Sequence, residues 1–394
     1  MFDANLDLLN PTAWNAELLA NDFPLRPALA AANTEIAGIN IAGQFAARNE
    51  TVKVHKADKP TGDANEYAGS GYSQDTPTFS ETTITMDKVY YRSFTIDKWD
   101  QNFALPDLVS VEVLPRIHNI LDTINKNKVK PELAKFATVV GDYNTTDYSV
   151  IDDTDLRQLR RLMLKEQYID DSPLMAVIDP DAEFDLVGLD LFKKANERGN
   201  NSIQLSGSMG TFSNMDFFLD NNTYSPSNSG AKGNAVVASA ASIGDTVITI
   251  DNGAGAASTC TLAEGDIVAF AGAKGRNDHY VVKSSTSTSI TLYQGLRSAV
   301  ANNATIDNIA SANAQFVYDP DSIVVVTALP AQSRVSNASG VTRIPFYEPT
   351  NKCNFLISIE GDTAGAQITI ETLVGAKNFY PTRGGLYLRG EVAK

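Results

Sequence analysis

Side chains that could act as a catalytic nucleophile are few at a useful spacing in this sequence. The segment SGSMG at 206–210 resembles the sharp turn that presents a nucleophilic serine for acyl transfer, and Ser208 would be that nucleophile. The pattern needs glycine where Ser206 stands, however, and the residues TFSNMDFF that follow lack the pattern of a helix. The segment therefore favours a structural turn, and a hydrolase that uses Ser208 is kept as a minor alternative.

Two glycine-rich segments have some features of phosphate-binding loops. GAGAAS at 253–258 follows a predicted strand, but Ser258 replaces the third glycine of a dinucleotide-binding turn and no helix follows. GAKGRN at 272–277 lacks both the spacing and the Ser or Thr of a phosphate-binding loop. Both segments are predicted to be turns between strands.

Potential metal ligands are scattered along the chain. The three histidines, His55, His118 and His279, fall in different predicted elements and show no HxH or HxxxH spacing. The acidic run DDTD at 152–155 lacks the glycine and the final glutamate of a calcium loop. It suits the start of a helix, where the helix dipole favours negative charge. We therefore predict no catalytic, cofactor-binding or metal-binding residues.

Composition limits the classes of partner. The 394 residues include 32 Lys and Arg against 47 Asp and Glu, a net charge of -15, which argues against a dedicated binder of nucleic acid or anionic membrane. The basic run RQLRRLMLK at 157–165 is assigned to a solvated or intersubunit helix face. Cys260 and Cys353 are predicted to be buried free thiols. Without a basic leader or an apolar run of 18 residues, the chain is expected to be soluble and made in the cytoplasm.

The first hundred residues are expected to contain an arm and a long hairpin. Residues 1–50 are predicted to form an arm or short helix that prolines interrupt. Residues 51–97 are predicted to form a hairpin with a loose, glycine-rich tip at 57–78 and an unbroken second strand at 83–96. The apolar residues of that strand are Ile84, Met86, Tyr90, Phe94 and Ile96. An isolated hairpin is marginally stable, so a neighbouring chain is expected to cover this apolar face.

Three helices are predicted in the next part of the chain. The first lies within 105–138 and is bent or started at Pro115, the second covers 153–168 with Asp153 or Thr154 as N-cap, and the third covers 179–199. Apolar residues three and four apart define the side that each helix buries. The predicted buried residues are Leu114, Ile117, Leu121 and Ile124 in the first helix, Leu156, Leu159 and Met163 in the second, and Phe184, Val187, Leu191 and Ala195 in the third.

A change of composition near residue 229 indicates an inserted module. From 229 to 313 the chain is rich in Ala, Ser, Thr, Gly and Val, with strand patterns at 245–251, 265–272, 279–285 and 289–295. We predict an autonomous small β barrel, whose core includes Val247, Ile248 and Ile250. Further strands are predicted at 321–330, 354–361 and 366–375. The whole chain is thus predicted to be α+β.

The order of these parts resembles the major capsid proteins of tailed bacteriophages, which have the Hong Kong 97 fold. The segments ASIGDTVITIDNGAG, LAEGDIVAFAGAKG and TSITLYQGLRSAVANNATI look like the β-barrel insertion domain of the podophage coat proteins in that family. GTFSNMDFFLDNN, FVYDPDSIVVVTALP and TLVGAKNFYPTRGGLYL look like its axial-domain and C-terminal strands. The resemblance implies an N-terminal arm (1–50), an extended-loop hairpin (51–98), a peripheral domain with a spine helix (99–140), the first part of an axial domain (141–228), an inserted β-barrel domain (229–313), and C-terminal axial and peripheral strands (314–394).

The resemblance implies a structural protein and not an enzyme. Family members assemble into pentamers and hexamers that form the icosahedral head around double-stranded DNA, and neighbouring subunits exchange arms and loops. The implied partners are further copies of the chain, with scaffolding, portal and decoration proteins; no membrane, cofactor or sequence-specific DNA contact is implied. The implied location is the virion, assembled in the host cytoplasm. A secreted or surface β-rich adhesin is the main alternative, which the Ser/Thr/Gly-rich module favours and the helical half disfavours.

Overall fold

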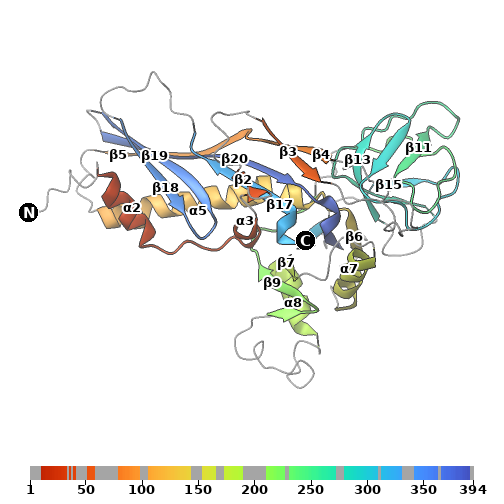
Figure 1. Ribbon diagram of the computed structural model, residues 1–394, viewed down its shortest axis with the longest axis horizontal. Helices are drawn as coiled ribbons and strands as arrows, with labels where there is room; N and C mark the ends of the chain where they lie inside the picture. The colour runs from red at the N-terminus through yellow and green to blue at the C-terminus, as the bar shows by residue number, and fades with distance from the viewer. Residues whose placement is uncertain are drawn as a thin grey trace, which may run out of the picture.

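The computed structural model describes residues 10–32, 35–36, 39–40, 51–57, 79–97, 105–142, 153–165, 173–189, 210–226, 230–271, 279–308, 312–330, 341–362 and 365–390. These residues form an elongated α+β molecule in which one long helix runs beneath an antiparallel sheet (Figure 1). A smaller α/β lobe lies below that pair, and a module of short strands lies at one end. Among the helices so described, none is long and apolar enough to cross a membrane.

The long helix runs without interruption through residues 105–133. Its parts are α4 (Leu105–Leu108), the π-helical turn η2 (Val109–Val113), α5 (Leu114–Ile124), the π-helical turn η3 (Asn125–Val129) and α6 (Lys130–Leu133). A π turn ends two residues before Pro115 and another two residues before Pro131. Proline lacks an N–H group and its ring clashes with the carbonyl four residues earlier, and a π turn relieves both problems by widening the helix locally. The helix therefore continues past Pro115 instead of starting there.

Five strands form the sheet above the long helix. They are β5 (Lys88–Asp97), β17 (Ile323–Ala328), β18 (Val341–Glu348), β19 (Cys353–Asp362) and β20 (Gly365–Asn378). Strand β20 pairs antiparallel with β17, β19 and β5, and β18 pairs with β19. The predicted stripe of the first helix is confirmed, because all four of its residues are buried in the core that helix and sheet share.

The strand predicted at 83–96 is in fact two strands in different sheets. Strand β3 (Thr51–Ala57) pairs antiparallel with β4 (Phe79–Thr85), whereas β5 begins after a break at Met86 and pairs with β20. Gly375 of β20 makes this break possible, since a Cβ there would lie 2.8 Å from both the Met86 sulfur and the Thr85 carbonyl oxygen. The alternation of apolar residues continues across the break because Ile84 and Met86 are both fully buried.

The prediction that a neighbouring chain covers this apolar face is also wrong for the described residues. Ile84 and Met86 pack in a cluster with Val324, Val326, Leu373 and Phe379 of the same chain. Tyr90, Phe94 and Ile96 are partly buried against the main core. The apolar face of this segment therefore packs against its own subunit.

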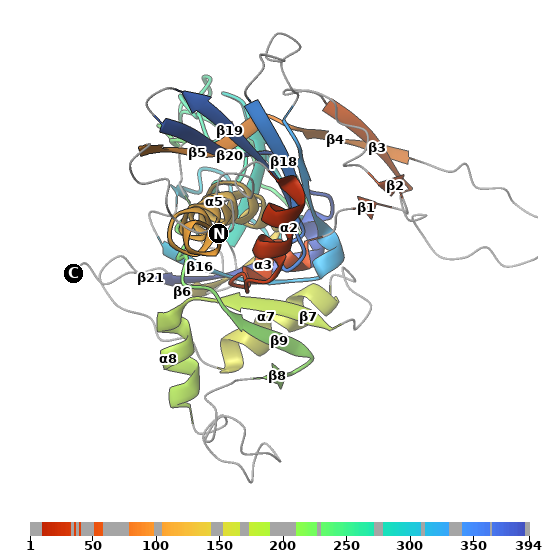
Figure 2. The same ribbon diagram turned by 90° about the vertical axis from the view of Figure 1, so that its left-hand side faces the viewer.

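The smaller lobe contains a mixed sheet with two helices on one face (Figure 2). Its strands are β6 (Thr138–Asp142), β21 (Gly384–Gly390), β16 (Ala312–Tyr318), β7 (Leu174–Ile178), β9 (Met215–Leu219) and β8 (Thr211–Phe212), in that spatial order. Strand β21 is parallel to β6 and β9 is parallel to β7, while the other pairs are antiparallel. The helices are α7 (Asp153–Lys165) and α8 (Pro180–Gly188).

The two helices agree only in part with the predicted stripes. Helix α7 buries Leu156, Leu159 and Met163 as predicted, and it begins at Asp153, so the two predicted N-cap residues lie inside the helix. Helix α8 buries Ala182 and Leu186. The assignment of Phe184 to the buried face is wrong, since Phe184 is 79% exposed. Val187 is partly buried against the apolar cluster of the lobe, and the last two predicted stripe residues, Leu191 and Ala195, lie outside the described residues.

The strands of residues 230–308 pair in a closed ring. They are β10 (Val236–Val237), β11 (Val247–Asp251), β12 (Ile267–Phe270), β13 (His279–Ser285), β14 (Ser289–Leu292) and β15 (Ile306–Asn308). The pairing order is β10, β11, β14, β13, β12 and β15, and a bridge from Val236 to Thr305 closes the ring. The ring encloses an apolar cluster of its own. Val247 was assigned to this core, and that is wrong because it is 54% exposed.

The ring is joined to the smaller lobe by backbone pairing. Strand β13 pairs with β6 through His279 opposite Val139 and Tyr280 opposite Thr138. The mixed sheet of the lobe therefore continues into the module. Autonomous folding of 229–313 stays a prediction.

The remaining elements lie mainly in the N-terminal segment and in short turns. They are α2 (Pro11–Leu19), α3 (Pro27–Ala31), the two-residue strands β1 (Glu35–Ile36) and β2 (Ile39–Asn40), and the 3-10 turns η4 (Pro320–Ser322) and η5 (Pro381–Arg383). Trp14 and Leu18 of α2 are fully buried in the main core. The part of the arm at 10–32 therefore packs on its own subunit and does not extend away from it.

Candidate assembly surfaces

Among the residues that suggested chemistry, those that the structure describes lie on separate elements. Ser208 and the segment 272–277 lie outside the described residues. The segment 253–258 is a loop after β11, with positive φ angles at Gly253 and Gly255, so the predicted turn is confirmed. The three histidines lie on β3, α5 and β13. Within the described ranges, no group of three or more His, Cys, Asp or Glu side chains could hold a metal ion.

The hairpin of β3 and β4 stands out from the molecule and is fixed at its root (Figure 2). Lys53 of β3 forms an ion pair of 2.6 Å with Glu81 of β4. At the root, the Lys128 ammonium of the long helix donates a hydrogen bond to the Asp87 carboxylate, directly after the buried Met86. In the described part of the chain, β3 and β4 pair with each other and with no further strand. Ile84 of β4 packs on the subunit's own core, whereas the outer edges of β3 and β4 are open to pairing with a partner.

The N-terminal segment is held on the long helix and on the turn between β18 and β19 by specific polar contacts. The Arg26 backbone N–H donates to Asn351 Oδ1 at 2.7 Å, and Asn351 Nδ2 donates to the Pro24 carbonyl at 3.1 Å. The Arg26 guanidinium also pairs with Asp122 of α5. These contacts orient the chain as it leaves α2.

An aromatic contact adds to this attachment. The Phe23 ring meets the His118 imidazole of α5 edge to face, with centroids 5.9 Å apart. Burial lowers the pKa of His118, and the nearby Arg26 charge lowers it further, while Asp122 and Glu348 oppose the change. The neutral imidazole is therefore the form that suits this attachment.

A buried ion pair joins the long helix to the smaller lobe. Lys130 Nζ lies 3.0 Å from Asp220 Oδ2, and both side chains are 3% exposed or less. Asn125 Nδ2 donates to the same carboxylate oxygen at 2.8 Å, and the Asn222 N–H donates to Asp220 Oδ1 at 2.9 Å. Burial lowers the pKa of Lys130, although Asp220 acts in the opposite direction. The pair fixes the end of β9 against the end of the long helix.

A second buried charge orients α8. Arg389 of β21 lies 3.4 Å from Asp185 and 3.6 Å from Asp181, both on α8. Asp179 caps this helix, since its Oδ1 accepts a hydrogen bond from the Ala182 N–H at 2.7 Å. Burial raises the pKa of Asp179 and lowers that of Arg389. Sequence spacing did not suggest either buried cluster, because the partners come from distant parts of the chain.

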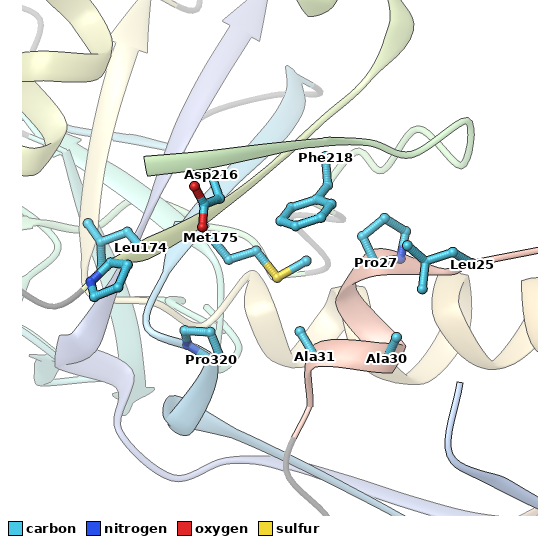
Figure 3. Close-up of a pocket in the computed structure, with 10 residues that line it drawn as sticks. Leu25, Pro27, Ala30, Ala31, Leu174, Met175, Asp216, Phe218 and Pro320 are labelled. Carbon is cyan, nitrogen blue, oxygen red and sulfur yellow. The ribbon is translucent and has the colours of Figure 1, made fainter. Parts of the chain in front are cut away.

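An apolar cavity of about 410 Å³ lies between the N-terminal segment and the smaller lobe (Figure 3). Its lining comes from the region of α3, from β7 and β9, and from Pro320. Asp216 is the one ionisable side chain among the ten lining residues, and it accepts a hydrogen bond of 2.5 Å from the Thr211 hydroxyl. A single carboxyl group without a base or nucleophile beside it in the lining does not make an active site.

Comparisons with known proteins found distant structural matches and no sequence match. No protein-family model matches the chain, and no curated protein sequence matches it. A chain from a structure of Mycobacterium phage Che8 is 12% identical, with a TM-score of 0.46 over 93% of both chains. A chain from the capsid of Cyanophage P-SCSP1u is 10% identical, with a TM-score of 0.46 over 87% of this chain and 84% of that one. For the virus-like particle from Pyrococcus furiosus the identity is 8% and the TM-score 0.38, over 95% of this chain and 98% of that one. Because these TM-scores are below 0.5, we base the function on the chain's own geometry.

Proposed function

We propose that this chain is the major capsid protein of a tailed bacteriophage, a structural subunit that forms pentamers and hexamers of an icosahedral head around double-stranded DNA. The observation that carries the proposal is the architecture. A long helix lies beneath an antiparallel sheet, a rooted two-stranded hairpin stands out from it, and a second α/β lobe carries the strand module (Figures 1 and 2). The proposal assigns these parts to the regions that the sequence resemblance implies.

The elongated shape suits a thin shell. A subunit of this shape touches several neighbours along its length, and many weak contacts repeated by symmetry give a stable assembly. The hairpin supports the proposal further, because the outer edges of β3 and β4 pair with no further described strand and are open to a neighbouring subunit. The fixed root at Asp87 and Lys128 would hold such a hairpin in a defined direction.

The acidic composition fits a container for DNA. A net charge of -15 disfavours tight binding to phosphate groups, so the packed DNA would be free to enter and leave. The proposed partners are further copies of the chain, and scaffolding, portal and decoration proteins. The proposed location is the virion, after assembly in the host cytoplasm, and no catalytic step is proposed.

The proposed domains are those that the resemblance implies, with the module at 229–313 as an inserted β barrel. Support comes from the closed ring of strand pairs and from the separate apolar cluster within it. We assign the module a stabilising role, because its pairing with β6 extends the sheet of the smaller lobe.

Sedimentation of the expressed protein tests the proposal. The chain is expressed alone and together with its scaffolding protein, and lysates are separated on density gradients after treatment with nuclease. We expect a fast-sedimenting fraction that contains the chain as its main protein. A chain that stays in the slow fractions in every condition contradicts a capsid role.

A further inference from the structure

Helix α7 presents a row of positive charge to solvent. Its exposed residues Arg157, Arg161 and Lys165 are four positions apart, so they lie along one side of the helix. The opposite side packs in the apolar cluster of the smaller lobe. We call these three residues the basic stripe. In a chain with a net charge of -15, such a row is electrostatically complementary to an acidic surface.

Helix α8 presents the complementary surface. The Asp181 side chain is 69% exposed, Glu183 is half-buried, and Phe184 beside them is the most exposed of the large apolar side chains in the described residues. We call these three residues the acidic face. Folding of the subunit does not account for Phe184, since the helix is already anchored by its buried side and by Arg389. Exposed aromatic residues beside charged groups are typical of protein interfaces.

The two surfaces are held in a fixed relation by one strand. On β21, the Tyr387 hydroxyl hydrogen-bonds Asp155 of α7 at 3.2 Å, and Arg389 two residues later pairs with Asp185 of α8. Both helices lie on the same side of the mixed sheet (Figures 1 and 2). A subunit therefore carries both halves of a complementary contact on one rigid layer.

We propose that the basic stripe of one copy packs against the acidic face of a second copy. The contact then joins different surfaces of the two copies, and repeated contacts of this kind close into a ring when the rotation allows it. The inference rests on the proposed function, because rings of five and six copies are what pentamers and hexamers require. Phe184 fits the contact as a surface for an arginine side chain, since guanidinium groups bind well to aromatic faces.

Nucleic acid is a poorer partner for the basic stripe. A phosphate backbone lying on α7 would be brought towards the carboxylates of α8, which are on the same layer and would repel it. A second copy offers the carboxylates themselves as the partner. We therefore commit to a protein contact and use nucleic-acid binding as an outcome of the test.

Charge reversal tests the contact. Arg161→Glu and Glu183→Arg each place like charges together, so each is expected to raise the protein concentration needed for assembly at least about tenfold. The double variant restores opposite charges with the signs exchanged and is expected to assemble within about threefold of the unaltered chain. Phe184→Ala is expected to weaken assembly by about tenfold. Lys88→Glu, the same change of charge at an exposed position of β5, is the control and should assemble normally.

The outcomes separate this inference from the proposed function. Circular dichroism first establishes that each variant subunit folds, and Arg161→Gln replaces Arg161→Glu if the latter does not. If the unaltered chain forms no rings or shells, the proposed function fails. If it assembles and the single reversals assemble equally well, only this inference fails. A double variant that is no better than the single ones, or reversals that abolish DNA binding and leave assembly unchanged, would also overturn it.

Discussion

Replacing Lys130 by methionine probes the junction between the long helix and the smaller lobe. Methionine keeps the length of the side chain and removes its charge. Asp220 then loses its cationic partner while it stays buried, with the Asn125 amide and the Asn222 N–H as its remaining donors. Removing one partner of a buried ion pair costs about 3–5 kcal/mol, because the other charge stays desolvated without compensation. The two remaining donors place this variant near the lower value, about 3 kcal/mol.

The expected change in melting temperature follows from the size of the protein. An unfolding entropy of about 2.1 cal/mol/K per residue gives about 0.8 kcal/mol/K for 394 residues. A loss of about 3 kcal/mol therefore lowers the melting temperature by about 4 °C. The variant in which Lys130→Met is combined with Asp220→Asn removes both charges. It is expected to recover about 2 kcal/mol relative to the sum of the two single changes.

Differential scanning calorimetry of unassembled subunits measures these effects. Lys126→Met is the matched control, since Lys126 is exposed on the same helix, and it should change stability by less than about 0.5 kcal/mol. A Lys130→Met variant that melts within about 1 °C of the unaltered chain would refute the reasoning. Additive effects of the two single changes would likewise show that the pair is not coupled.

Three further predictions concern single side chains. The thiol of Cys353 is fully buried, and burial raises its pKa. Maleimide should therefore label Cys353 only when the protein unfolds, and rapid labelling of the native protein would contradict its burial. Burial lowers the pKa of His118 below its usual 6.5 in the folded state, so the unfolded state binds more protons and stability should fall as the pH drops below 6.5. Melting curves from pH 5 to 8 should show a smaller loss of stability at low pH in His118→Gln than in the unaltered chain. The same pH profile in both proteins would exclude the histidine as the cause of the loss. Gly384→Ala would place a Cβ 2.5 Å from the Phe136 ring and should lower the free energy of unfolding by about 1–3 kcal/mol. Gly188→Ala is the control: no atom lies within 4 Å of its Cβ, so it should lower the free energy of unfolding by less than about 0.5 kcal/mol. Equal losses in thermal unfolding of the two variants would be inconsistent with this packing.

The spacing of apolar residues predicted helices and strands correctly in the examples below, where the element packs against one continuous apolar surface. The stripe of Leu114, Ile117, Leu121 and Ile124 was found from its spacing because the whole helix packs against one core. Predicted strands at 354–361 and 366–375 correspond to β19 and β20 for the same reason. The two buried free thiols were also predicted correctly.

Features that depend on distant partners could not be predicted from the sequence. The break at Met86 does not interrupt the alternation of apolar residues, because Met86 at the break is buried like Ile84 before it. Gly375, far away in the chain, leaves the space that the break needs. The Asp220 cluster has the same origin, since 95 residues separate Asn125 from its acceptor. Phe184 followed the helical spacing and is nevertheless exposed, because spacing does not show how much of a short helix the sheet covers.

Electron cryomicroscopy of the purified, assembled protein tests the capsid role most directly. We predict closed shells of uniform size with icosahedral symmetry, in which rings of five and six copies repeat. The density of each copy should show the long helix beneath its sheet and the hairpin of β3 and β4 lying on a neighbour. Monodisperse monomers or dimers at every concentration, with and without a scaffolding protein, would contradict the account.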